Sequence, residues 1–93
     1  MALNPSDKIV KEVQVLIEEG LHMRPAMQLV ECANKYDSSV SLSNGKTEVD
    51  GKSIMQVTML AATKGTMLTL SASGSDAHQQ VEALALIIED KVK

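Results

Sequence analysis

The stretch that decides the fold is KEVQVLIEEGLHMRPAMQLVECANKY, residues 11–36, which changes its periodicity at Gly20. From residue 11 to 17, apolar and polar side chains alternate, which is typical of a half-buried β-strand. After Pro25, apolar residues recur three and four positions apart to the end of the stretch, which predicts an amphipathic α-helix that begins at a proline. The chain therefore passes from strand to helix through a short segment that contains His22.

The rest of the chain repeats these two patterns, strand-like alternation and helix-like spacing. The dipeptide Asn44-Gly45 predicts a hairpin between two of the strands. Ser53, followed three residues later by Gln56, has the form of a capping box and predicts the start of a short helix. The predicted strands are residues 11–17, 39–43, 46–49 and 67–72, and the predicted helices cover about residues 25–36, 54–62 and 77–92.

Each predicted element has one apolar face. Four such strands and three such helices, in the order β-α-β-β-α-β-α, predict a two-layer α+β domain whose helices cover one face of the sheet. Residues 1–8 are expected to form a flexible N-terminal tail, followed by one domain, residues 9–93. The positions expected to face the core are Val13, Val15, Ile17, Ala26, Leu29, Val30, Ala33, Val40, Leu42, Ile54, Val57, Leu60, Ala61, Leu68, Leu70, Ala72, Ala77, Val81, Leu84, Ala85 and Ile88.

Composition excludes several classes of function. A chain of 93 residues, 44% of them hydrophobic and 23% charged, is typical of one small globular domain. A net charge of −3 and a single aromatic residue, Tyr36, argue against a nucleic-acid-binding surface. The longest useful apolar run, residues 83–88, is far shorter than the roughly 20 residues of a membrane span, and the N-terminus has no pattern of a secretory signal.

The residues that could ligate a soft metal ion show no recognised spacing. They are His22, Cys32 and His78, and we therefore expect neither a metal site nor a cofactor. A lone cysteine cannot form an internal disulfide, which is typical of a protein of the reducing cytoplasm. We interpret Cys32 as a packing residue, and His78 and the pair Glu18-Glu19 as solvated.

The segment Gly20–Ala26, GLHMRPA, carries the first chemical signal. His22 and Arg24 lie next to a predicted helix start, whose unpaired N–H groups and positive dipole end favour an anion. The Arg24 guanidinium matches the geometry of phosphate oxygens, and a neutral His22 imidazole is a nucleophile. The residues thus allow phosphoryl acceptance at His22. A solvated turn histidine without function is the alternative.

Ser53 carries the second signal. As the N-cap of a helix it needs no other role, but a helix start also tolerates the negative charge of a phosphoryl group on this serine. The neighbouring Ile54 and Met55 could form an exposed apolar contact patch or pack in the core, and their spacing does not decide between the two.

Four motifs together resemble one family. They are GLHMRPA (20–26), GKSIMQVTML (51–60), KGT (64–66) and SGSD (73–76). In this order and spacing the sequence resembles HPr, the histidine-containing phosphocarrier family of the bacterial phosphoenolpyruvate:sugar phosphotransferase system, over about residues 9–91. The resemblance implies an open-faced β-sandwich: a four-stranded antiparallel sheet with three helices on one face.

The resemblance also implies the function and its partners. His22, through Nδ1, would accept a phosphoryl group from phosphorylated enzyme I and pass it to the A components of sugar permeases, with Arg24 stabilising the group. The chain would then be a cytoplasmic, monomeric carrier that acts stoichiometrically, not as a turnover enzyme. Ser53 would be the target of HPr kinase/phosphorylase, with a catabolite regulator as a further partner. Partners would dock on the apolar residues Met23, Met27, Ile54 and Met55.

Two other functions remain open at the level of sequence. The first is a regulatory HPr-like interaction module, of the nitrogen-linked or carbon-catabolite type, that does not drive sugar transport. The second is a small ligand-binding domain, which would need an enclosed pocket that a core of this size leaves little room for. Three departures from the common family pattern lie near the expected docking residues: Met23 in place of alanine, Gln56 in place of glycine, and Thr58-Met59 in place of a Met-Ser pair.

Overall fold

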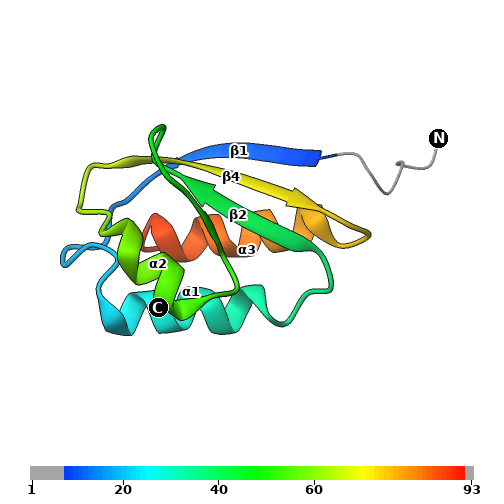
Figure 1. Cartoon of the computed structure of the whole chain (residues 1–93), viewed down its shortest axis with the longest axis horizontal. Coiled ribbons are helices and arrows are strands. Elements are labelled where there is room, and N and C mark those ends of the chain that lie inside the picture. The colour runs from blue at the N-terminus through cyan, green and yellow to red at the C-terminus, as the bar shows by residue number, and fades with distance from the viewer. Residues whose placement is uncertain (1–7, 92–93) are drawn as a thin grey trace.

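All three helices lie on one face of a four-stranded antiparallel sheet in the computed structural model, which describes residues 8–91 (Figure 1). The element order and this layering confirm the predicted α+β fold. No helix in residues 8–91 is both long and apolar enough to cross a membrane. The strands are β1 (Lys8–Gln14), β2 (Ser39–Ser43), β3 (Glu48–Asp50) and β4 (Met67–Ser73), and the helices are α1 (Met23–Ala33), α2 (Ile54–Leu60) and α3 (Ala77–Ile88).

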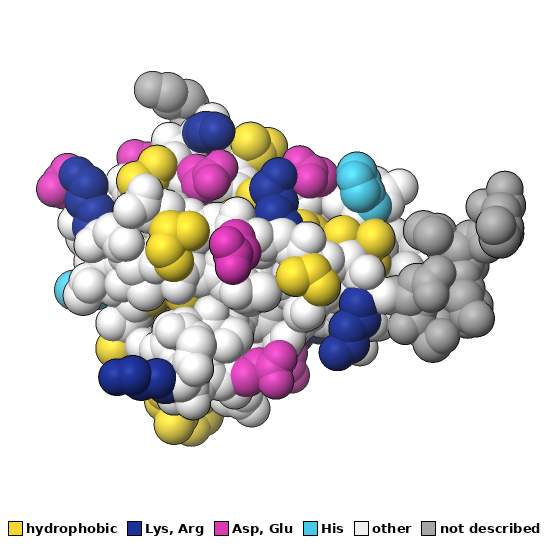
Figure 2. Space-filling view, turned by 90° about the horizontal axis from the view of Figure 1, so that it is seen from above, with side chains coloured by type: hydrophobic (Ala, Val, Ile, Leu, Met, Phe, Trp, Pro, Cys, Tyr) yellow, Lys and Arg dark blue, Asp and Glu magenta, His cyan; other side chains and the backbone are white. Residues whose placement is uncertain are grey.

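The sheet has the strand order β1-β4-β2-β3, and every neighbouring pair is antiparallel. Its register aligns the apolar positions of the strands: Leu70 on β4 lies opposite Leu42 on β2, and Leu42 lies opposite Val49 on β3. The helices therefore meet a continuous apolar surface. The uncovered face of the sheet carries charged side chains of both signs, with hydrophobic side chains scattered between them (Figure 2).

The predicted core is confirmed at nearly every position. Val30 and Ile54 are half-buried and pack against the core cluster. The prediction for Ala61 is wrong, because this residue adopts a left-handed conformation (φ 52°) that ends α2 and leaves its side chain exposed. Ala62 occupies the buried place instead. The predicted core positions that are buried are Val13, Val15, Ile17, Ala26, Leu29, Ala33, Val40, Leu42, Val57, Leu60, Leu68, Leu70, Ala72, Ala77, Val81, Leu84, Ala85 and Ile88.

Several element boundaries differ from the prediction. The expected tail, residues 1–8, lies outside the described residues except for Lys8, which is the first residue of β1. The chain continues the alternating burial of β1 as far as Ile17, although the ladder with β4 ends at Gln14. Helix α1 ends at Ala33, α3 ends at Ile88, and the expected end of the last helix at residue 92 lies outside the described residues.

The β2–β3 hairpin forms, with its turn one residue later than predicted. Asn44 is the residue before the turn: its N–H donates to the Thr47 carbonyl oxygen, at 3.2 Å. Its side-chain Oδ1 accepts from the N–H groups of Lys46 and Thr47, at 2.9 and 2.8 Å. Gly45, with φ +93°, supplies the positive dihedral that the turn requires.

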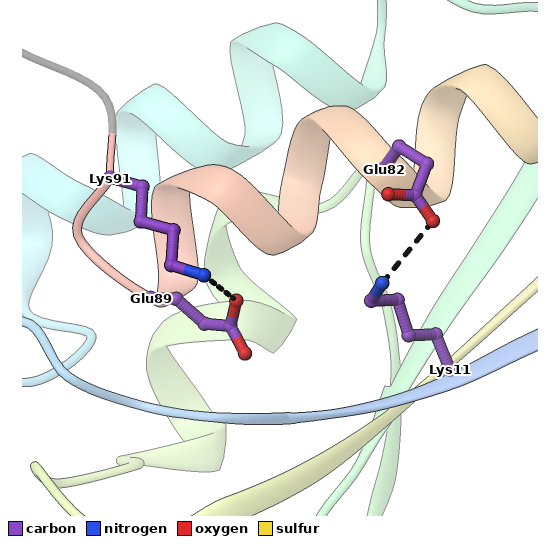
Figure 3. Close-up of polar contacts among 4 residues, drawn as sticks. All are labelled: Lys11, Glu82, Glu89 and Lys91. Atoms are coloured by element: carbon purple, nitrogen blue, oxygen red, sulfur yellow. Dashed lines mark hydrogen bonds and ion pairs between the residues drawn. The ribbon is translucent and has the colours of Figure 1, made fainter.

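Two ion pairs involve the last helix, α3 (Figure 3). Lys11 lies on the helix side of the edge strand β1, and its Nζ lies 3.3 Å from Oε2 of Glu82 on α3. An inward-pointing lysine also discourages the open edge of β1 from pairing with another strand. Lys91 pairs with Glu89 just after the helix, at 3.4 Å. Both pairs are solvent-accessible, so each stabilises the fold by about 1 kcal/mol at most.

A polar cluster joins the start of α3 to the segment before β2, at the end of the molecule where α1 ends (Figure 1). The Asp76 carboxylate accepts hydrogen bonds from the Ser38 hydroxyl and from the N–H groups of Asp37 and Ser38. Buried Gln80 donates to the carbonyl oxygens of Ala33 and Ser38, each at 3.0 Å. The hydrogen bonds that the Asp76 carboxylate accepts, above all the one from the Ser38 hydroxyl, hold the pKa of Asp76 below its usual range.

A lowered carboxyl pKa makes the contribution of Asp76 to stability dependent on pH. The contribution is complete above the unfolded value, about 3.9, and is lost as the pH falls through the folded pKa. We expect Asp76→Asn to be less stable than wild type at pH 7, with the difference shrinking below about pH 4. Urea unfolding at several pH values measures this. The assignment would be contradicted if Asp76→Asn lost stability with falling pH in the same way as wild type.

Candidate functional site

His22 occupies the N-cap of α1. Its backbone is extended, with φ −77° and ψ −176°, and its carbonyl oxygen accepts from the Ala26 N–H at 2.8 Å, closing the first turn. The imidazole is exposed and makes no capping hydrogen bond. The N–H groups of Met23 and Arg24 have no partner within the helix, and Pro25 has no N–H to offer. An exposed imidazole thus lies next to two unpaired backbone donors at the positive end of a helix dipole.

The segment before His22 is locked to the end of α2. Gly20, with φ +76°, turns the chain after Ile17, and the N–H of the next residue, Leu21, donates to the Ala62 carbonyl oxygen at 2.8 Å. Leu21 is only 1% exposed, so its side chain anchors the segment in the core. A side chain at Gly20 would place Cβ 2.7 Å from the same Ala62 oxygen, so the two segments approach more closely than any other residue allows.

As a result, His22 borders a shallow hollow between the start of α1 and the end of α2, which lie at the same end of the molecule (Figure 1). The hollow opens to solvent, so a group bound there remains accessible to a second protein. The residues that line it are Leu21, His22, Met23, Thr58, Ala61 and Thr63.

Arg24 does not line the same hollow. Its Nη2 donates to Oε2 of Glu19 at 2.6 Å, on the side of α1 that faces the end of α3. This hydrogen bond is the main reason that the pKa of the Glu19 carboxyl lies below its usual value. The structure therefore brings His22 and Arg24 to one helix start with their side chains in separate hollows. The sequence did not predict the ion pair between Glu19 and Arg24. Glu19 precedes the turn at Gly20 and lies outside α1, so the spacing rules for side-chain pairs within a helix do not apply to these two residues.

Ser53 is the N-cap of α2, as predicted. Its Oγ accepts from the Gln56 N–H at 3.3 Å, which is the first half of a capping box. The second half differs from the standard pattern: the Gln56 Oε1 accepts from the Asp50 N–H at 2.8 Å, and the Ser53 N–H donates to the Asp50 carbonyl oxygen. Gln56 therefore ties α2 to the end of β3.

The segment that carries Ser53 is also attached to the end of α1. The Lys52 Nζ donates to the carbonyl oxygen of Tyr36 at 2.7 Å. The Asn34 side chain donates to the carbonyl oxygens of Val30 and Lys52, at 2.9 and 3.3 Å. These bonds fix the start of α2 against α1, which keeps Ser53 half-buried at the edge of the surface that both helices share.

An apolar surface runs across α1 and α2. Three of the four expected docking residues, Met23, Met27 and Ile54, line one hollow between the helices. Met55, the fourth, lies next to Ile54 on α2 and is 73% exposed. Sequence reasoning did not include Met59, which is 74% exposed one turn further along α2. We refer to Met23, Met27, Ile54, Met55 and Met59 as the methionine surface.

The remaining candidates have structural positions. Cys32 is half-buried on α1, and burial raises the pKa of its thiol, so it is a packing residue with little thiolate. His78 is exposed on the first turn of α3. Within residues 8–91, no three His, Cys, Asp or Glu side chains come together in a way that could hold a metal ion.

Comparison with known proteins decides the family. A family model described as "PTS HPr component phosphorylation site" matches residues 9–90. The chain belongs to the HPr family. A phosphocarrier protein HPr from Haemophilus influenzae is 40% identical over 78 residues, which cover 84% of this chain and 92% of that protein. The HPr-like protein Crh of Bacillus subtilis is 37% identical over 84 residues, 90% of this chain and 99% of that one.

Solved structures agree with this assignment. The crystal structure of a phosphocarrier protein HPr from Bacillus anthracis superposes with a TM-score of 0.84 at 37% identity, covering 87% of this chain and 96% of that chain. The open-faced sandwich that the sequence resemblance implied is thereby confirmed as an HPr fold. The family is one of phosphocarriers of the phosphotransferase system, and it includes proteins named HPr and proteins named Crh.

The close approach at Gly20 gives a stability test of the site. We expect Gly20→Ala to unfold more easily than Gly65→Ala, by about 1 kcal/mol or more, because only the first substitution adds a clash with a backbone oxygen to the strain of a positive φ. Gly65 is a matched control, since it has φ +96° and nothing within 4 Å of an added Cβ. Urea unfolding measures both, and equal losses would show that the two segments can separate without cost.

Proposed function

We propose that this protein is a phosphoryl carrier that accepts a phosphoryl group on Nδ1 of His22 from phosphorylated enzyme I and passes it to the A components of sugar permeases. The observation that carries the proposal is the position of His22: exposed, free of a capping hydrogen bond, and next to the unpaired N–H groups of Met23 and Arg24. Membership of a phosphocarrier family supports the same chemistry.

The transfer step needs little from this chain. The Nδ1 lone pair of neutral His22 attacks phosphorus, the N–P bond forms, and the bond to the donor atom breaks, with that atom keeping the electron pair. The proton on Nε2 stays on the ring. Backbone N–H groups at a helix start hydrogen-bond to phosphoryl oxygens, and the helix dipole favours their negative charge. The same step in reverse passes the group to an acceptor.

Arg24 adds a mobile donor to this arrangement. Its guanidinium can hold two phosphoryl oxygens at once, as guanidinium–phosphate pairs commonly do. Its side chain is 70% exposed and that of its partner Glu19 is 41% exposed, so the pair is solvated and Arg24 can leave Glu19 at low cost. In this function Arg24 leaves Glu19 and binds the phosphoryl group while it is transferred to His22.

An open site suits a carrier more than an enzyme. Donor and acceptor must reach the same imidazole in turn, and His22 borders a hollow that is open to solvent. The methionine surface next to it offers adaptable side chains for partners of different shape. Transient docking with modest interfaces would allow fast exchange between partners. The proposed carrier acts as a monomeric single domain in the cytoplasm, with which the lone thiol of Cys32 is consistent.

The chain offers a matched control for the acceptor, because both of its histidines are exposed at helix starts. With phosphoenolpyruvate and enzyme I, we expect His22→Ala to incorporate no phosphate and His78→Ala to incorporate as much as wild type. Both variants should keep wild-type stability within about 0.5 kcal/mol, because neither side chain is buried. Phosphate incorporation followed by mass spectrometry measures the first outcome. Labelling of His22→Ala would place the acceptor elsewhere.

We further propose that Ser53 is phosphorylated by HPr kinase/phosphorylase and that this slows transfer through His22. The hydroxyl lies at the start of α2, where a phosphoryl group adds up to two negative charges beside Ile54 and Met55. A partner that covers these residues would have to desolvate that charge. The fold itself tolerates it, because a helix N-terminus stabilises negative charge.

Two substitutions of Ser53 distinguish the effect of a negative charge at this position on phosphoryl transfer from the effect of losing the helix cap on stability. We expect Ser53→Asp to slow phosphoryl acceptance from enzyme I by about fivefold, the effect of roughly one unit charge at close range in water. Because aspartate also caps helices, stability should change little. Ser53→Ala is the control: it should lose about 0.5–2 kcal/mol of stability without slowing transfer. Equal transfer rates in the Asp and Ala variants would remove the regulatory role of Ser53.

A regulatory HPr-like module is the second candidate, and similarity to the protein named Crh favours it. In that function the methionine surface and a modified Ser53 bind a catabolite regulator, or a nitrogen-linked partner, and His22 carries no phosphoryl group. Incubation with enzyme I and phosphoenolpyruvate discriminates between the two candidates. Label on His22 favours the carrier, whereas ATP-dependent label on Ser53 alone favours the module.

A further inference from the structure

Glu19 holds the Arg24 side chain in the unphosphorylated protein. The turn at Gly20 reverses the chain, which brings a residue five positions before Arg24 alongside the first turn of α1. The resulting contact, from Nη2 to Oε2, is 2.6 Å long and joins two full charges. Such a short charge-assisted bond occupies part of the guanidinium fork that would otherwise be directed at an anion.

The surroundings of Arg24 are acidic. Its hollow is bordered by the carboxylates of Glu18, Glu19 and Asp90, whereas the hollow of His22 contains no carboxylate. Glu18 is already paired with Lys64, at 3.0 Å. Glu19 is therefore the carboxylate that engages Arg24, and it does so away from the hollow of His22.

We infer that Glu19 is a positioning residue that keeps Arg24 away from His22 until a phosphoryl group takes the place of the Glu19 carboxylate as partner of the guanidinium. The inference rests on the proposed function at His22. It adds a residue outside the His22 hollow that sets how readily the carrier is loaded.

The energetics allow such an exchange. The Arg24 and Glu19 side chains are 70% and 41% exposed, so the pair is solvated and weak. A phosphoryl group carries more negative charge than a carboxylate and accepts two guanidinium hydrogen bonds, so it competes well for Arg24. The hydrogen bond from Arg24 also holds the pKa of the Glu19 carboxyl below its usual value, which shows that the pair favours the charged form of Glu19. Replacement of the Glu19 carboxylate by a phosphoryl group as the partner of Arg24 therefore has a small but non-zero free-energy cost.

Removal of the Glu19 charge should release Arg24 and speed loading. The test uses phosphoramidate, a small donor that transfers its phosphoryl group to a histidine as its own P–N bond breaks and ammonia leaves. With no protein donor present, a change in rate cannot come from altered docking. The rate of N–P bond formation on His22 is followed by ³¹P NMR. We expect E19Q to load about two- to fivefold faster than wild type, which is the range of a solvated ion pair.

Two further variants separate the role of Glu19 from a general charge effect. E18Q removes the same charge from the adjacent residue, which pairs with Lys64 and not with Arg24, and should load at the wild-type rate. In an Arg24→Ala background, E19Q should no longer increase the rate. The NMR signal of the Arg24 guanidinium gives an independent readout: loading of wild type should shift it, because the phosphoryl group replaces the Glu19 carboxylate as its partner, and in E19Q it should already differ from wild type before loading, because that carboxylate is gone.

The outcomes distinguish this inference from the function on which it rests. If wild type is loaded but E19Q is no faster than E18Q, Glu19 has no positioning role. An equal gain for E19Q with and without Arg24 would also overturn the inference, because Glu19 would then act only through its own charge. If wild type itself forms no phosphohistidine with phosphoramidate or with enzyme I, the proposed function is wrong, and the inference about Glu19 is wrong with it.

Discussion

The hydrogen bond from the Leu21 N–H to the Ala62 carbonyl oxygen determines the arrangement of the candidate site. It joins the segment before α1 to the segment after α2, and the absence of a side chain at Gly20 allows the close approach. Buried Leu21 then fixes the backbone one residue before His22. From this constraint follow the extended conformation of His22, the start of α1 beside the end of α2, and the position of the methionine surface next to the imidazole.

Local patterns were enough to predict the fold and the positions of His22 and Ser53 at helix starts. Apolar and polar residues alternate along most of β1, β2 and β4, and the buried apolar ones lie on the face of the sheet that the helices cover. The spacing of Ser53 and Gln56 indicates the start of α2. The pattern failed at Ala61, because apolar character alone cannot show that the helix ends there in a left-handed residue. Sequence patterns also did not predict the ion pair between Glu19 and Arg24. This pair forms across the turn at Gly20, and the direction of the chain after that turn is set by tertiary contacts.

The proposed carrier would work through interactions that are individually weak. Arg24 would exchange partners at low cost, because its present pair is solvated. The N–H groups at the start of α1, which have no partner within the helix, would bind an anion without any movement of the backbone. Ser53 caps the neighbouring helix, so a charge there would change the proposed docking surface while leaving the transfer chemistry in place. In this account, loading, docking and regulation would depend on different residues around the start of α1 and α2, while the core beneath the two helices would remain unchanged.

The most direct measurement is the chemical stability of the label after incubation with phosphoenolpyruvate and enzyme I. A phosphoryl group on an imidazole nitrogen is lost in acid and retained in alkali, whereas a serine phosphate survives acid. We predict one phosphoryl group per chain that is lost in acid, retained in alkali and bound to His22. An acid-stable label, or no label on a chain that is readily modified at Ser53 with ATP, would contradict the account.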